Sequence, residues 1–474
     1  MVRSLFTGGR LVVPALLLFL VSACKVGQNY QRPELPVPEQ FRSAPTPGTG
    51  TAARLPWREV FPNPELQQLI GTALTGNFDL QAAIKRIEES QAYLRQTRYA
   101  LLPSVSGQVA ASTITPSRNS LNGVSLENFI GQRHLEDFSV SAGVSWELDI
   151  WGKIRRQNEV TRANYLQTEE GARAVRTNLV AHVAHGYFNL LLLDAQLDIA
   201  RRNLALSDSI VQVIRLQKDG GEVTELAVEQ AQAQRQTAAL LRSQLEQAIL
   251  IGENGLRQLM GEMPGSVART VRLDAVPVSD SLPAGVPVQL LANRPDVRAG
   301  ELALVAANAR VGVAQASLYP SLLITVGGGI NAFQAANWFM LPASLFYSVA
   351  GGLSQPIFQR GQLKTQLEVA RIQREEALIR FRQVLTNGVR EVSDALAQAE
   401  KLKEQEQVAA VRVVTLKRAI ADARLLFTSG LANYLEVITA QSNVLQAELA
   451  LAQIRQQRLA ASVELYRALG GGWQ

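Results

Sequence analysis

The chain of 474 residues has a single cysteine and only 3 histidines. One cysteine cannot form an intrachain disulfide, so a disulfide-stapled fold is excluded. His182 and His185 lie three residues apart, but no cysteine or clear carboxylate partner completes a metal site with them. Serine, threonine and histidine residues are scattered, and none forms a recognisable nucleophile with a neighbouring base. We therefore expect no enzyme, no metal and no cofactor.

Clustered charge and long apolar runs are also missing. The 47 basic and 41 acidic residues give a net charge of +6, and they are interspersed along helical stretches rather than gathered in a patch. This pattern does not favour nucleic-acid binding. Beyond the N-terminus no run of 18 apolar residues occurs, so no membrane-spanning helix is predicted. If the chain crosses a membrane, we expect it to do so as a β-barrel.

The N-terminus has the pattern of an export signal, which we predict over residues 1–23. Two arginines precede an apolar run from Leu11 to Val21, which is too short to span a membrane. The cysteine that follows, Cys24, resembles the cysteine of the bacterial lipoprotein box. The resemblance implies cleavage before Cys24 and an N-acyl and S-diacylglycerol lipid on it. The alternative is an ordinary signal followed by an incidental thiol. Lys25 after the cysteine favours the outer membrane over the inner one.

The rest of the chain is an extended segment followed by two copies of one unit. Residues 24–60 contain six prolines, which predicts a lipid-anchored tether without helix. Asp79 and Pro103 recur 217 residues later as Asp296 and Pro320, and Ala231-Gln232 is echoed by Ala440-Gln441. We predict a first repeat at 61–263, a linker at 264–287 and a second repeat at 288–474, with a functional surface shared between the copies.

Four segments alternate between apolar residues and small polar ones. Such a period of two predicts strands that separate two environments. Each segment has the length of a tilted membrane-spanning strand. A soluble sandwich is the alternative, but the serine- and glycine-rich faces are too small to fill a core. The predicted strands cover about 104–114 and 138–148 in the first repeat, and about 321–331 and 344–355 in the second.

Long helices account for most of the remainder. No proline occurs between Gly152 and Met263 or after Ile357, which predicts helices of about 100 Å that pack side by side. A shorter helix is expected from Leu66 to Leu101, and the Gly470–Trp473 tail is expected to be flexible. The long helices are predicted over 153–218 and 362–428, with antiparallel returns over 223–259 and 432–468.

The strand count has a consequence for assembly. Four strands cannot close on themselves, and their free edges are not tolerated in lipid. Two chains would give eight strands and an interior filled by side chains, whereas three give 12 and leave a lumen. Three-fold assembly is therefore the smallest solution with a pore.

Several motifs resemble the TolC-like outer membrane factor family, within it the lipoprotein branch of RND efflux outer membrane channels (the NodT type). They are Asn293-Arg-Pro-Asp-Val-Arg-Ala-Gly-Glu-Leu, Tyr319-Pro-Ser-Leu and Tyr466-Arg-Ala-Leu-Gly-Gly-Gly-Trp473, together with Cys24. The resemblance implies a mainly α chain with a membrane β-barrel. In the homotrimer, a 12-stranded barrel with four strands per chain is continued by a long α-helical periplasmic barrel.

The resemblance also implies a function and partners. The chain would be the outer membrane exit duct of a tripartite efflux pump that exports small molecules such as drugs from a Gram-negative cell. It would be lipid-anchored in the outer membrane, with a long periplasmic extension. Its partners would be a periplasmic adaptor (membrane fusion protein), an inner-membrane RND transporter and outer membrane lipid. The alternatives are a duct for type I polypeptide secretion and a lipid-anchored helical periplasmic scaffold.

The resemblance places a gate where the helical hairpins turn, with Phe427, Leu435, Glu436 and Thr439 in the ring that narrows it. Thr439 departs from the pattern, because related lipoproteins tend to carry aspartate there. Glu436 lies one helical turn earlier, and we expect it to supply an acidic constriction beside the apolar Leu435 and Phe427. The alternative is a solvated carboxylate favoured by the helix dipole.

The turns themselves are candidates for docking the adaptor. Gly221 and Gly430 are expected to form the reversals, since a tight helix end needs a residue that tolerates positive φ. Glu222 and Glu225 lie at the first reversal and are candidate adaptor contacts. Partners of the helix dipole are the alternative reading of these two carboxylates.

Overall fold

The computed structural model of the protein describes residues 26–42, 50–129, 131, 133–277 and 283–474. The chain divides into two compact units, each built from segments of both repeats. The first contains the strands, the end of α4 and the beginnings of α6 and α10. The second contains α2, α3, α7, α8, α11 and the larger parts of α6 and α10. The helices and strands are α2 (Trp57–Val60), α3 (Pro64–Gly76), α4 (Phe78–Tyr99), β1 (Ser104–Ile114), α5 (Leu121–Phe129), β2 (Leu135–Leu148), α6 (Lys153–Asp219), α7 (Glu225–Leu259), α8 (Leu290–Asn293), α9 (Pro295–Ala316), β3 (Ser321–Ala332), β4 (Leu345–Ser354), α10 (Gln362–Thr428) and α11 (Tyr434–Ala468), with short 3-10 turns at Ala52–Arg54, Leu273–Ala275, Pro287–Gln289 and Ala335–Asn337.

The duplication predicted from the sequence is visible in the element lengths. The pair α4 and α9 has 22 residues each, α6 and α10 have 67 each, and α7 and α11 have 35 each. The long helices and their returns match the predicted ranges to within about two residues. Equivalent positions in the hairpins, such as Gly221 and Gly430, are 209 residues apart. Equal lengths therefore let positions of one hairpin be compared with those of the other.

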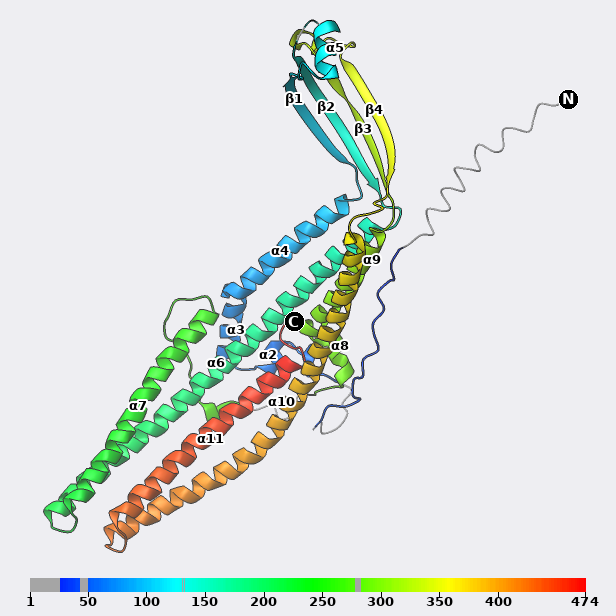
Figure 1. Cartoon of the computed structure of the whole chain (residues 1–474). Helices are drawn as coiled ribbons and strands as arrows, with labels where there is room; N and C mark the ends of the chain where they lie inside the picture. The colour runs from blue at the N-terminus through cyan, green and yellow to red at the C-terminus, as the bar shows by residue number, and fades with distance from the viewer. Residues whose placement is uncertain (1–25, 43–49, 130, 132, 278–282) are drawn as a thin grey trace. The chain divides into compact units, whose positions relative to one another are not determined.

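The first unit contains one antiparallel sheet with the order β1-β2-β3-β4, which Figure 1 shows as four neighbouring arrows. The β2–β3 pairing joins the two repeats, with Val144 opposite Val326. Gly329 is needed for this pairing, because a Cβ atom there would lie 2.1 Å from the Val140 carbonyl oxygen. Apolar side chains on the outer strands are exposed, among them Val109 and Tyr347. The sheet leaves one edge of β1 and one edge of β4 unpaired among the described residues.

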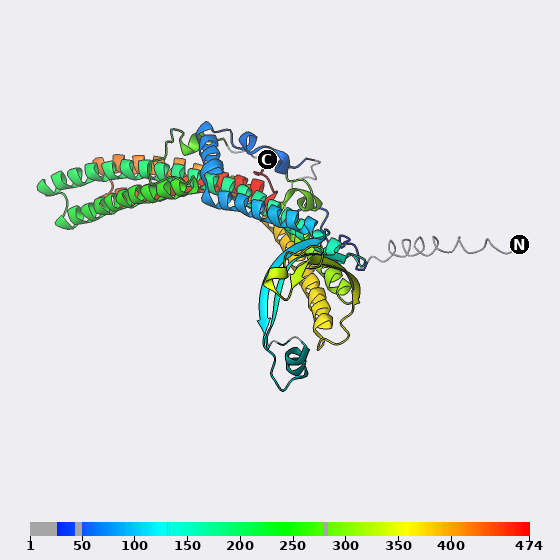
Figure 2. The ribbon, with the colours of Figure 1, turned by 90° about the horizontal axis from the view of Figure 1, so that it is seen from above.

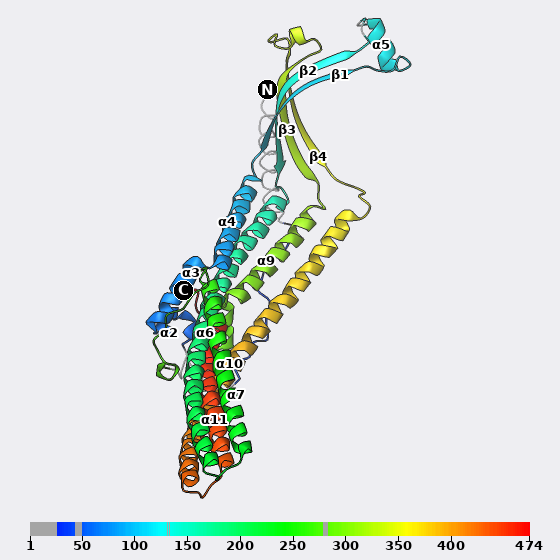
Figure 3. The same cartoon turned by 90° about the vertical axis from the view of Figure 1, so that its left-hand side faces the viewer.

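The second unit contains two long helical hairpins, α6–α7 and α10–α11. Figures 2 and 3 show these hairpins side by side. Its core is built from one face of α6 together with α3 and α11, and includes the fully buried Trp57, Tyr187 and Tyr466. Among the residues that the structure describes, no helix is both long and apolar enough to cross a membrane.

Five expectations are corrected by the structure, the last of them at the C-terminal tail. The helix expected from Leu66 to Leu101 is divided at Asn77, whose backbone is extended and whose side chain caps the next helix by accepting a 2.9 Å hydrogen bond from Leu80 N–H. The tether contains a 3-10 turn at Ala52–Arg54 and α2, because no proline lies within either of them and Pro56 occupies the position just before α2. The connection between β1 and β2, which is long and polar and was expected to be a surface loop, contains α5. In addition, β2 begins at Leu135, three residues before the predicted start.

The C-terminal tail is packed, against the expectation that it is flexible. Gly470, Gly471 and Gly472 are buried. A Cβ atom on Gly471 would lie 2.2 Å from the ring of Tyr466. The guanidinium of Arg173 lies 4.7 Å from the centre of the Trp473 ring, within the range of a cation–π contact. The glycines thus allow the tail to approach the core closely, and they do not serve as a linker.

Candidate functional site at the two helix reversals

Both hairpins reverse through the same backbone motif. Gly221 and Gly430 follow the ends of α6 and α10 with φ angles of +78° and +74°. In each turn the glycine N–H donates to the carbonyl three residues earlier, at 2.9 and 3.1 Å. The next N–H donates to the carbonyl five residues earlier, at 2.8 Å in both turns. This is the Schellman arrangement, and its left-handed residue explains why glycine stands at both positions.

The reversal of α6 into α7 is held together by apolar packing and one ion pair. Val211 and Ile214 of α6 pack against Ala227 and Val228 of α7. Glu225, in the first turn of α7, is paired with Lys218 near the end of α6, whereas Glu222 is exposed. Both predicted adaptor contacts are therefore exposed, and they differ in that the carboxylate of Glu225 is engaged in an ion pair.

The predicted gate residues fall into two groups. Leu435, Glu436 and Thr439 all lie on the exposed face of α11, one helical turn or less apart. Asn433 caps this helix, because its side-chain oxygen accepts hydrogen bonds from the N–H groups of Leu435 and Glu436 at 2.9 and 3.2 Å. Phe427 differs from these three, because it is half-buried against the apolar cluster of the other hairpin.

The cluster at this end also joins the two hairpins. Phe427 and Tyr434 pack against the cluster of α6 and α7 residues. The Tyr434 hydroxyl donates a 2.6 Å hydrogen bond to the side-chain oxygen of Gln230 on α7. Phe427 therefore lies in the contact between the two hairpins, whereas Leu435, Glu436 and Thr439 are exposed on the surface of the chain.

A buried polar cluster joins α6 to α11, and the sequence analysis did not identify it. Gln441 is 2% exposed, and its side-chain NH₂ lies 2.8 Å from Asn203 Oδ1, 2.8 Å from Ser207 Oγ and 3.3 Å from the Asn203 carbonyl oxygen. Asn203 and Ser207 are themselves buried. Asn203 Nδ2 is buried without a hydrogen-bond partner among the described residues, but the hydrogen bonds of Gln441 still fix which residues of α6 and α11 face each other. The Ala440-Gln441 echo was the only signal in the sequence that pointed to it.

Ion pairs join α10 to α11 further along the hairpin. Glu406 accepts hydrogen bonds from Arg455 at 3.1 Å and Arg458 at 2.7 Å, and Lys417 is 2.6 Å from Glu448. Burial acts to raise the pKa of Glu406, but the hydrogen bonds from Arg458 and Arg455 outweigh it and leave this pKa lowered. The carboxylate is therefore ionised and paired at neutral pH, and its ion pairs link α10 to α11.

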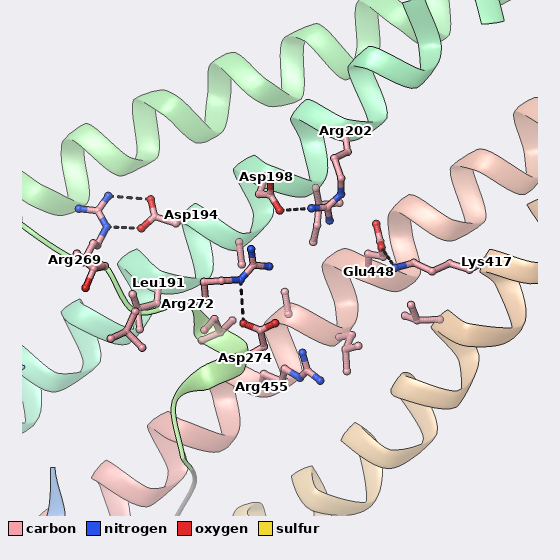
Figure 4. Close-up of a pocket in the computed structure, with 18 residues that line it drawn as sticks. Leu191, Asp194, Asp198, Arg202, Arg269, Arg272, Asp274, Lys417, Glu448 and Arg455 are labelled. Carbon is pink, nitrogen blue, oxygen red and sulfur yellow. Dashed lines mark hydrogen bonds and ion pairs between the residues drawn. The ribbon is translucent and has the colours of Figure 1, made fainter. Parts of the chain in front are cut away.

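A charged cavity of about 420 Å³ lies in the second unit between α6, α10, α11 and the segment after α7 (Figure 4). Its carboxylates are paired with cations: Asp194 with Arg269, Asp198 with Arg202, Asp274 with Arg272, and Glu448 with Lys417. In the described parts of the chain, no group of three or more histidine, cysteine or carboxylate side chains could hold a metal ion. The paired charges give the cavity a structural role in connecting these elements.

The predicted lipidation site, Cys24, lies outside the described residues, but the chain that follows it is fixed. Arg156, which is 6% exposed, donates hydrogen bonds to the Gly27 carbonyl at 2.9 Å and to Asn29 Oδ1 at 3.0 Å. Asn308 of α9 donates to the Gln28 carbonyl at 3.0 Å. The segment beginning at Val26 therefore has a defined course over the start of α6 and the middle of α9.

The fold and the hairpin ends match a known family over nearly the whole chain. A family model described as "Outer membrane efflux protein" matches residues 69–262 and 286–471. The cation efflux system protein CusC of Escherichia coli O6:H1 is 32% identical over 98% of this chain and 99% of its own length. The toluene efflux pump outer membrane protein TtgC of Pseudomonas putida is 30% identical, with 97% of this chain and 95% of that protein covered.

A solved structure agrees with these relatives. The open state of the MtrE outer membrane channel of Neisseria gonorrhoeae matches with a TM-score of 0.84 at 25% identity, covering 95% of this chain and 99% of that one. The fold class is that of the trimeric outer membrane efflux channels, in which each chain supplies four strands and a pair of long helical hairpins. This chain belongs to the outer membrane efflux protein family and is an outer membrane channel for efflux.

Proposed function

We propose that three copies of this chain form the exit duct of a tripartite pump and that they receive small molecules from an inner-membrane RND transporter through a periplasmic adaptor. The observation that carries the proposal is the four-stranded sheet, whose outer edges on β1 and β4 have no partner among the described residues. Three such sheets supply 12 strands, which close a barrel with a lumen and remove every edge.

The exported compounds are proposed as a broad class. The names of two relatives specify cations and toluene, which share little chemistry beyond small size. We infer that the transporter selects the compound and that this chain provides the passage. The test is deletion of the chain from its host with a panel of antibiotics, dyes, solvents and metal salts. Higher intracellular accumulation of at least one class is expected, and unchanged accumulation across the panel would refute the proposal.

The gate is proposed at the exposed face of α11. Three copies of Glu436 in one ring would attract cations, and the neighbouring Leu435 and Thr439 would narrow the passage. The test is single-channel conductance of Glu436→Ala in planar bilayers. Lower cation preference and altered conductance are expected. Glu229→Ala removes an exposed carboxylate from the other hairpin and serves as the matched control. Equal conductance and equal cation preference of the two variants would show that Glu436 does not form the acidic ring of the gate.

Lipid attachment at Cys24 is proposed from the signal pattern and from the ordered course of the residues that follow it. Metabolic labelling with a radioactive fatty acid should mark the wild-type protein. Cys24→Ala should remain unlabelled, whereas Ser22→Ala, two residues earlier, should retain the label. Labelling of the Cys24→Ala protein would contradict the assignment.

Adaptor docking is proposed at the two reversals, where Gly221, Glu222, Glu225 and Gly430 lie. Glu222 is exposed and unconstrained by the Lys218 pair that holds Glu225. Charge reversal at Glu222 should therefore weaken adaptor capture more than charge reversal at Glu225. Co-purification of a cross-linked adaptor measures this, and equal capture by both variants would argue against direct contact.

A further inference from the structure

A second cavity in the second unit differs from the charged one in its lining. It has a volume of about 580 Å³, and most of its walls are apolar. The walls come from three parts of the chain: Phe61 and Leu66 in the α2–α3 region, Val271 and Val276 in the segment after α7, and Leu459 of α11. A cavity of this size with apolar walls and few polar groups is typical of a small-molecule site.

The walls of this cavity are held in place by contacts within the chain. The Tyr466 hydroxyl donates a 2.6 Å hydrogen bond to the carbonyl of Leu55, and the rings of Tyr466 and Phe61 lie edge to face with centroids 5.9 Å apart. The N–H of Ala52 donates to the Pro283 carbonyl at 2.7 Å, which ties the tether to the segment after α7. The cavity is therefore formed without a ligand, and a ligand that enters does not have to order its walls.

The lining carries one uncompensated negative charge. Glu59 is the only charged residue among the described residues that line the cavity. Its carboxylate is exposed and has no ion-pair partner in the described parts of the chain, whereas the neighbouring Arg58 lies over the Trp57 ring at 4.4 Å. The Ser462 hydroxyl also lines the cavity and donates to the Leu459 carbonyl at 2.7 Å, so its oxygen can still accept a hydrogen bond. These two acceptors suit a ligand that carries a cation.

We propose that this cavity binds an amphipathic amine, a molecule with an apolar aromatic body and a protonated amino group. The apolar body lies against Phe61, Leu66 and Leu459, and the ammonium pairs with Glu59. A neutral hydrocarbon gains only the first of these contacts, and an anion is repelled by the carboxylate. The bound amine touches the tether, the segment after α7 and α11 together, so it stabilises their packing. The site belongs to the single chain and does not depend on the duct function proposed above.

Monodansylcadaverine is the probe, because it has a naphthalene ring and a flexible chain that ends in an ammonium group. It is titrated into the full-length protein in lipid nanodiscs, with empty nanodiscs as the blank, and its fluorescence rises in apolar surroundings. Saturable binding is expected, with a dissociation constant on the order of 10–100 µM. The N-acetylated probe, which lacks the charge, should bind about twofold to about fivefold more weakly, because Glu59 is exposed to solvent.

Two variants separate the role of the charge from the role of the cavity. Glu59→Gln should weaken binding of the amine about twofold to about fivefold and leave the acetylated probe unchanged. Glu229→Gln, which alters an exposed carboxylate on α7, is the matched control and should change neither. Ala275→Trp fills the cavity from an exposed position in its wall and should remove saturable binding of both probes. Equal binding of the amine by Glu59→Gln and Glu229→Gln would overturn the charge pairing, and wild-type binding by Ala275→Trp would overturn the cavity as the site.

Hydrogen exchange of the wild-type protein gives a readout that does not depend on how the variants fold. At about ten times the dissociation constant of the probe, peptides from residues 55–66 and 271–276 should exchange about tenfold more slowly, because a ligand that binds only the closed form lowers the frequency of opening by that factor. Peptides from the helix reversal at 215–232 should not change. A fluorescence signal equal to that of empty nanodiscs, or slowing spread evenly over the chain, would refute the proposal.

Discussion

Replacement of Gln441 by leucine is the substitution whose effect the structure specifies most fully. Leucine is shorter and branched, but it is of broadly similar volume and carries no hydrogen-bonding group, so the main effect of the change is the loss of hydrogen bonds. Asn203 Oδ1 loses the donor that lies 2.8 Å away, in a cluster whose three members are each less than 8% exposed. Ser207 keeps its 2.9 Å hydrogen bond to the Asn203 carbonyl and loses only its contact with Gln441.

The expected cost follows from these contacts. A buried polar group left without a partner costs about 1–3 kcal/mol, and a lost hydrogen bond at Ser207 adds about 1 kcal/mol. Together these losses should lower the free energy needed to separate α11 from α6 by about 2–4 kcal/mol. Because 1.4 kcal/mol is a factor of ten in an equilibrium constant, local opening should become about 30-fold to about 700-fold more frequent.

Hydrogen exchange measured by mass spectrometry on peptides from residues 434–445 reports this opening directly. Gln232→Leu is the matched control, since it makes the same change at the equivalent position of the other hairpin, and less than about threefold acceleration is expected there. The triple variant Asn203→Leu, Ser207→Ala, Gln441→Leu should recover most of the protection, because no polar group is left buried. Equal exchange in Gln441→Leu and Gln232→Leu would refute the reasoning.

Three further substitutions follow from the structure. Gly430→Val should lower the stability of the turn by about 1–3 kcal/mol, because valine is strained at φ +74°, and it should abolish drug resistance. Asparagine tolerates this conformation, so Gly430→Asn should keep resistance. Equal resistance of the two variants would show that the conformation of this turn does not matter for efflux. The hydrogen bond with His185, followed by Arg467, lowers the pKa of Glu464 from 4.5 to about 2. Its ionised form therefore stabilises the fold at neutral pH, by about 1–2 kcal/mol after solvent screening, and this contribution is lost as the pH falls from about 5 towards 2. The urea concentration at the midpoint of unfolding should be higher for wild type than for Glu464→Gln at pH 7, and the two midpoints should converge near pH 2. A difference that stays constant with pH would show that ionised Glu464 does not stabilise the fold. Arg294→Met should lower the free energy of unfolding by about 3–5 kcal/mol, because the guanidinium is 4% exposed and forms ion pairs with Asp296 and Glu391 and a hydrogen bond to a carbonyl. A thermal unfolding temperature equal to that of wild type would refute this prediction.

The regular parts of the fold could be predicted from the sequence because their signals are local and repeated. Alternation over a ten-residue segment fixes a strand, and a long stretch without proline fixes a helix. The ends of α6 and α10 were predicted from Gly221 and Gly430, because a position with left-handed backbone conformation is usually occupied by glycine. The same locality explains the errors. Asn77 ends one helix and caps the next. An asparagine within a helical pattern can also lie inside a helix, so its presence did not predict this break.

The site was less predictable because its contacts are long-range. Gln441 meets Asn203 across 238 positions of sequence, and no local pattern connects a glutamine in one helix with an asparagine in another. The packed tail had the same cause: its glycines suggested a linker, whereas their small size permits contact with Tyr466. The exposed face that carries Leu435, Glu436 and Thr439 remains a prediction about a ring that only the assembled trimer completes.

Completion of one chain's sheet by the sheets of two other chains underlies the proposed function. Sedimentation of the detergent-extracted protein, corrected for bound detergent, measures this directly. We expect a protein mass close to three times that of the processed chain, with the full helical content retained. A folded species with the mass of a single chain would contradict it.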